Sequence, residues 1–113
     1  MFDENPANNP TRVWEVGGRD VDFDARALLR KLDSTGIGIV RHLIDHPDQT
    51  CPVQDVADAV GRPAGEVEDA VAWINTLAEA LGYRDLVERV PSGVRLPAAT
   101  VAVARQGLID AQR

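Results

Sequence analysis

The chain has 113 residues, a formal net charge of −6 and a single cysteine. This length fits one domain, which can bury a core without metal or disulfide staples. A lone thiol cannot close an internal disulfide, and no apolar run approaches the roughly 20 residues that a membrane-spanning helix needs. We therefore expect a single-domain cytoplasmic protein that has no cofactor.

The N-terminal region predicts a flexible segment followed by a short hairpin. Residues 1–12 contain two Asn-Pro pairs and should be flexible. Two short runs, 13–16 and 20–23, flank a Gly-Gly-Arg turn at 17–19, and its glycines permit the positive φ values of a tight turn. We therefore expect an N-terminal β-hairpin, with Trp14 facing the core.

Apolar residues recur at helical spacing through the middle of the chain. They predict one helix that ends near Lys31 and another over 37–45, which stops before a His-Pro pair because the residue before proline disfavours the α conformation. A short helix, Pro52–Val60, closes on Gly61, a residue suited to a left-handed C-cap. The longest helix, Ala64–Leu81, repeats apolar residues at i, i+3, i+4 and i+7.

The last third of the chain predicts a hairpin and a terminal helix. Two β-prone runs within Leu86–Leu96 surround a Pro-Ser-Gly turn. An Ala-rich segment then predicts a helix over Ala98–Ala111, although Gly107 and several β-branched residues weaken this prediction. We expect the terminal helix to mediate self-association, because it carries an apolar strip that a small domain does not fully bury: Val101, Ala102, Leu108 and Ile109.

The segment Thr35–Leu96 resembles the winged helix-turn-helix superfamily. The resemblance lies in the sequence pattern "PVQDVADAVGRP…VEDAVAWINTLAEALGY…LVERVPSGVRLP", which matches a second helix, a turn, a third helix and a wing. It covers about half of the chain. It implies a mainly α fold with a small β component: a three-helix core and a wing, to which the N-terminal β-hairpin and the C-terminal helix are added. The domain limits that follow are a flexible N-terminus at 1–12, a winged-helix domain at 13–97, and a terminal helix at 98–113 that serves dimerisation.

The resemblance also implies a function. Most members of the superfamily bind DNA, and most small bacterial ones are transcription regulators. In the family the third helix of the core, here Ala64–Leu81, enters the major groove, while the wing touches the backbone or the minor groove. A fold does not fix a function, however, so the site must be argued from its own residues.

The charge of the Ala64–Leu81 helix argues against DNA reading. No Lys or Arg occurs between Arg62 and Arg84, whereas a DNA reader gains free energy by placing cations near phosphates and releasing counterions. Tryptophan is enriched at protein-binding hot spots, although Trp73 could instead pack under the wing or against the N-terminal hairpin. We expect the face opposite the apolar stripe to bind a protein partner through Glu68, Asp69, Trp73, Thr76 and Glu79.

DNA binding through the wing is the alternative. The last 31 residues hold five arginines and three acids, so this part of the chain is basic although the whole is acidic. We favour the interpretation that these cations are ordinary solvated side chains, which are common at strand edges, over a role in DNA binding. If DNA is bound, we expect contacts from the wing and its flanks: Arg62, Arg84, Arg89, Ser92 and Arg95.

No residue pattern predicts an enzyme. His42 and His46 are four residues apart, but no third ligand is evident and Pro47 pulls His46 out of helical geometry, so surface histidines are favoured over a zinc site. Cys51 has no identifiable base partner. The paired carboxylates of the Ala64–Leu81 helix lie on a solvated surface, where nothing raises their pKa values for acid–base catalysis. We expect neither a catalytic nor a metal site.

Overall fold

The computed structural model describes residues 12–17 and 20–113. Over these residues the chain is mainly helical with one small antiparallel sheet, which confirms the coarse class predicted from the sequence. Its elements, in chain order, are α1 (Val21–Arg30), α2 (Ser34–Ile44), α3 (Val53–Val60), α4 (Ala64–Ala80), β1 (Glu88–Val90), β2 (Gly93–Arg95) and α5 (Ala98–Ala111).

The predicted N-terminal hairpin is wrong. Its second strand, 20–23, lies almost wholly within α1, where Val21, Ala25 and Leu28 are buried at helical spacing. The helical stripe overrides the local turn signal because burying that stripe stabilises more than a two-stranded ribbon can. Part of the predicted turn, and all of the predicted flexible segment except Arg12, lie outside the described residues.

The other elements begin and end close to their predicted limits. The Asp33 carboxylate accepts a hydrogen bond from the Gly36 amide at 2.9 Å and caps α2. Gly61 takes the left-handed conformation, with φ of 71°, and ends α3 as predicted. The hairpin turns at Pro91 and Ser92, and α5 has the predicted bounds.

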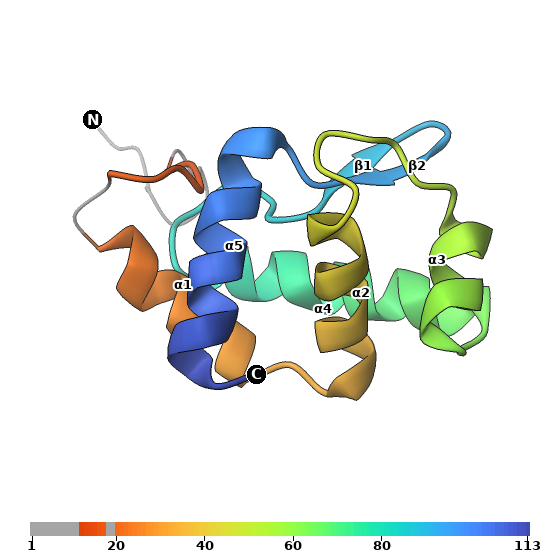
Figure 1. The fold of residues 1–113 in the computed structure, drawn as a ribbon, viewed down its shortest axis with the longest axis horizontal. Helices are drawn as coiled ribbons and strands as arrows, with labels where there is room; N and C mark the ends of the chain where they lie inside the picture. Colours follow the sequence, from red (N-terminus) through yellow and green to blue (C-terminus); the bar gives the residue numbers. More distant parts are fainter. Residues whose placement is uncertain (1–11, 18–19) are drawn as a thin grey trace, which may run out of the picture.

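The helices form two adjoining groups. Helices α2, α3 and α4 pack against one another in pairs, and α5 packs mainly against α1 while also touching α2. Figure 1 shows α1 and α5 side by side at one end of the molecule, with α3 and the hairpin at the other end and α4 running behind both groups. One continuous core of Leu, Ile, Val and Ala side chains joins the groups.

The hairpin gains a third strand-like partner. β1 and β2 pair with Arg89 opposite Val94, and Val94 also exchanges two backbone hydrogen bonds with Cys51, at 2.8 and 2.9 Å. The approach of Cys51 is so close that a Cβ atom on Gly93 would lie 2.1 Å from the Cys51 carbonyl oxygen. Glycine at this position therefore permits the connection before α3 to lie against β2.

Trp14 faces the core, as predicted, and packs there against Tyr83. Its ring stacks on Tyr83 with centroids 3.9 Å apart, and its indole N–H donates to the Arg84 carbonyl oxygen at 2.9 Å. The Tyr83 hydroxyl donates to Asp24 at 2.7 Å, and burial together with that carboxylate raises the pKa of Tyr83 well above its usual range. This cluster fastens the segment before α1 to the chain that leaves α4.

Candidate interaction site on α4 and the hairpin

The outer face of α4 carries the residues that the sequence predicts to bind a protein partner. Val67, Val71, Ile74 and Ala78 point into the core. Trp73 lies on the opposite side with 52% of its surface exposed, and the hollow beside it is lined by α4 and residues 32–36. The predicted contact residues on α4 are all exposed: Glu68, Asp69, Trp73, Thr76 and Glu79.

Helical geometry divides these five residues into two rows. Asp69, Trp73 and Thr76 follow i, i+4, i+7 spacing and form one outward ridge. Glu68 and Glu79 belong to a neighbouring row that also contains Asn75 and faces the hairpin. The five residues therefore share the solvent side of α4, and three of them line two hollows: Glu68 and Asp69 one, Asp69 and Trp73 the other.

The first hollow lies beside Trp73. It has a volume of about 280 Å³ and is formed between α4 and the connection from α1 to α2. Leu32 and Ala70 supply apolar surface, and three carboxylates belong to the same lining: Asp33, Glu66 and Asp69. An indole next to a small apolar recess with an acidic rim suits a partner that carries both apolar and basic side chains.

The second hollow is a groove of about 660 Å³ between α4 and the hairpin. Five valines from α3, α4, β1 and β2 belong to its lining: Val53, Val67, Val71, Val90 and Val94. Val53 and Val90 are partly exposed, and the other three are buried behind them. Glu68 and Asp69 line it from α4, and Arg89 lines it from β1. Sequence reasoning missed this groove because residues far apart in the chain form it, and no local spacing marks such a meeting.

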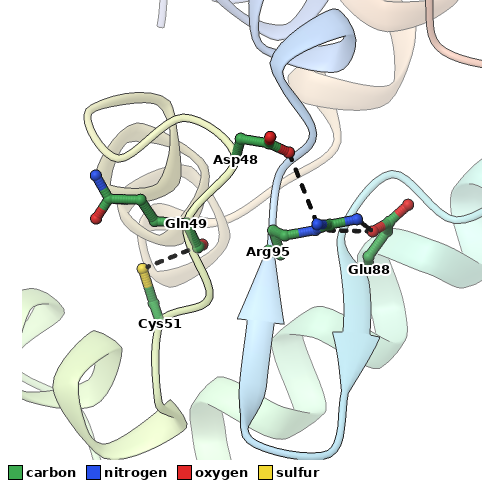
Figure 2. A network of polar contacts seen from close by, with 5 residues as sticks. All are labelled: Asp48, Gln49, Cys51, Glu88 and Arg95. Atoms are coloured by element: carbon green, nitrogen blue, oxygen red, sulfur yellow. Dashed lines mark hydrogen bonds and ion pairs between the residues drawn. The ribbon is translucent and has the colours of Figure 1, made fainter.

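Arg95 is occupied by carboxylates of the same chain. Its guanidinium donates to Glu88 at 2.6 Å and lies 3.8 Å from Asp48, as Figure 2 shows. The hydrogen bond and the charge of Glu88 raise the pKa of Arg95. Because these carboxylates already neutralise much of its charge, Arg95 is poorly suited to bind a phosphate, as DNA binding through the wing requires.

The remaining residues of the DNA alternative do not gather in one place. Arg62 precedes α4 and Arg84 follows it, and a helix of 17 residues is about 25 Å long. Ser92 lies at the hairpin tip, and Arg89 shares a sheet face with the buried Val94. Within residues 12–17 and 20–113, Arg89 makes no ion pair, so it keeps its charge available in the groove.

The histidines and the cysteine have structural surroundings. The rings of His42 and His46 are 4.5 Å apart, and burial followed by the charge of His46 lowers the pKa of His42. The described part of the chain contains no group of three residues that could hold a metal ion. Cys51 is buried, and this burial, with the charge of Asp55, raises the pKa of its thiol, which therefore stays protonated at neutral pH.

Comparisons with family models, with curated proteins and with solved structures find no match to this chain. Across the residues that the structure describes, no helix has the length and apolar character to cross a membrane.

Proposed function

We propose that this chain is a winged-helix domain that binds a protein partner through the outer ridge of α4. The order α2, α3, α4 and hairpin supports the winged-helix assignment, as does the isolated antiparallel bridge between Cys51 and Val94 of β2. The observation that carries the functional proposal is the 52% exposure of Trp73 beside an acidic hollow.

Trp73 is suited to anchor a partner. A large aromatic side chain left half exposed retains apolar surface, and burying such surface contributes about 25 cal/mol per Å². Aromatic anchors of this kind supply much of the energy of protein interfaces, since they lose little conformational entropy when they bind. The hollow next to Trp73 would receive a side chain of the partner, which makes the contact specific.

The charge of the surface favours a basic partner. Helices α3 and α4 and their connection carry six carboxylates and one arginine, Arg62. Complementary charge accelerates association and excludes partners of the wrong sign. A basic protein segment therefore fits this face, whereas the phosphates of DNA would be repelled by it.

The test compares Trp73→Ala with a matched variant at another exposed aromatic residue. Phe23 on α1 is 68% exposed, so Phe23→Ala removes a similar side chain from a different surface. Proteins captured by the immobilised full chain are identified for the wild type and for both variants, and each candidate is then purified and its Kd measured. We expect Trp73→Ala to weaken the true complex by at least about 30-fold, or about 2 kcal/mol, and Phe23→Ala to leave it unchanged.

A parallel titration with duplex DNA at low and moderate salt tests the alternative function, DNA binding. We expect only weak binding, which salt abolishes and which Arg89→Ala reduces while Trp73→Ala does not. Tight binding to a defined duplex at moderate salt that is lost in Trp73→Ala, but kept in Arg89→Ala, would show that α4 reads the major groove. The proposal of a protein partner would then be wrong.

A further inference from the structure

The outer edge of β1 presents an unpaired peptide group. Val94 directs both its N–H and its C=O toward Cys51, at 2.9 and 2.8 Å, and so points them away from β1. Arg89 lies opposite Val94, and in an antiparallel pair such residues turn their backbone groups away from each other. The N–H and C=O of Arg89 therefore face outward, and neither has a hydrogen-bond partner among the described residues.

Two residues earlier, the same edge is already occupied by a side chain. The Asn75 amide donates to the Val87 carbonyl oxygen at 2.9 Å, and the Val87 N–H donates to the Asn75 carbonyl oxygen at 3.1 Å. A neighbouring β-strand would make this pair of bonds with its backbone. The buried side chain of Asn75 thus makes the two hydrogen bonds that a neighbouring strand would make with Val87.

Beyond Asn75 the space beside β1 is open. The preceding residues on the same row of α4 are Ala72 and Glu68, and both line the 660 Å³ groove together with Arg89. Ala72 has only a methyl group, so it does not fill the position that the amide of Asn75 occupies one turn later. The free peptide group of Arg89 consequently borders a groove that has both apolar surface and the carboxylates of Glu68 and Asp69.

From this arrangement we infer that the groove binds an extended segment of the protein partner, which adds to β1 as a further strand. The segment pairs its backbone with Arg89, buries an apolar side chain against Val53, Ala72 and Val90, and places a lysine or arginine near the groove's carboxylates. This inference rests on the proposed function, because it specifies how the same partner continues from the ridge of α4 to the hairpin.

A second copy of this chain fits the edge less well. If two β1 strands paired about a two-fold axis through the Arg89 peptide group, the two Arg89 side chains would lie directly opposite each other. Like charges at that position oppose pairing, which is a common protection of strand edges. The groove instead combines acidic residues with a single cation, and this favours a basic strand of different sequence.

The probe for this site is a blocked peptide of six alternating valine and lysine residues, added to the ¹⁵N-labelled full chain. Its binding should shift the Arg89 amide resonance and slow the hydrogen exchange of that amide. A peptide methylated on alternate backbone nitrogens cannot form the strand bonds, and we expect it to bind about tenfold more weakly. Replacing its lysines by glutamates should abolish binding.

Two pairs of variants locate the contact. Glu68→Gln should weaken binding of the lysine peptide, while Glu15→Gln, at an exposed glutamate outside the groove, should not. Ala72→Arg should fill the groove and prevent binding, and Ala80→Arg, at an exposed position near the end of α4, is its control. If the N-methylated peptide binds as well as the unmodified one, or if the Arg89 amide does not respond at millimolar peptide, the inference is wrong.

The outcome also separates this inference from the proposed function. A partner complex that is weakened by Trp73→Ala but unaffected by Ala72→Arg would keep the ridge as the binding surface and overturn strand addition. Loss of the complex in both variants supports both statements. A complex that neither substitution affects contradicts both, since Trp73 and Ala72 then lie outside the interface.

Discussion

Asn75 shows how one buried polar side chain can connect a helix to a strand. In the sequence it is a polar residue within the predicted helix Ala64–Leu81, and helical spacing alone gives it no role. In the structure both halves of its amide are satisfied by the backbone of Val87. A buried amide with this pairing rigidifies its surroundings, because the low local dielectric strengthens each bond and penalises its loss.

We predict that Asn75→Ala destabilises the protein by about 2–3 kcal/mol, since it leaves the Val87 N–H and C=O buried without partners. Urea unfolding measures this change. Thr76→Ala is the control, because Thr76 is the exposed neighbour and its replacement should change the free energy of unfolding by less than about 0.5 kcal/mol. Equal losses in both variants would contradict the role given to the amide.

The two tryptophans differ enough to report separately on the ridge of α4. Trp14 is 2% exposed and Trp73 is 52% exposed, so iodide should quench the emission of Trp73 and spare that of Trp14. In Trp73→Phe we expect the quenchable component to disappear, and in Trp14→Phe we expect nearly all of the remaining emission to be quenched. Resistance of Trp73 to iodide would mean that this side chain is covered in solution, contrary to the exposed ridge.

At the scale of elements, local signals predicted most boundaries and tertiary contacts determined the rest. Asp33, Gly61 and the Pro-Ser-Gly turn act through their immediate neighbours, which is why the limits of α2, α3 and the hairpin were predicted to within a few residues. The N-terminal hairpin failed because its turn signal competed with a helical stripe that has a core to cover. The groove beside β1 depends on how far α4 stands from the hairpin, and no short pattern encodes that spacing.

The close packing of α5 on α1 explains why Gly107 lies within α5, although a glycine weakens the sequence-based prediction of a helix there. Gly107 lies where α5 meets α1, and a Cβ atom there would be 2.6 Å from Leu29 Cδ1 and 3.2 Å from Ala25 Cβ. We predict that Gly107→Val destabilises the protein by about 2 kcal/mol or more through overpacking. Gln106→Val places the same β-branched residue at the exposed neighbour and should cost only the few tenths of a kcal/mol of helix propensity. Thermal unfolding compares the two, and similar losses would exclude a packing role for Gly107.

Across the whole molecule, acidic and basic side chains gather in two different regions. The α3–α4 side is acidic, while a groove of about 530 Å³ between α2 and α5 contains Arg41, Arg105 and Arg113. Arg113 already donates to three carbonyl oxygens at the end of α1, so Arg41 and Arg105 are the arginines of that groove with exposed side chains and no such role. A basic partner would therefore be steered toward the α3–α4 side and away from α5.

The apolar strip of α5 that predicts self-association is not one surface in the structure. Val101 is buried and Leu108 is half-buried, whereas Ala102 and Ile109 point outward, with Ile109 65% exposed. Removal of residues 98–113 would no longer be a clean test, since Val103 and other α5 side chains belong to the core and their loss would expose it. A single substitution on the outer face replaces that deletion.

We predict that Ile109→Arg converts a dimer formed through α5 into a monomer without unfolding the domain. Two copies that pack Ile109 against each other bring the Arg105 side chains close together as well, so such a dimer should be stronger at high salt, where this repulsion is screened. Sedimentation equilibrium of the wild type and the variant at two salt concentrations measures both effects, with circular dichroism to confirm that the variant stays folded. Phe23→Arg changes an equally exposed apolar residue on α1 and should leave the mass unaltered. A wild-type chain that sediments as a monomer at high protein and salt concentrations would rule out association through α5.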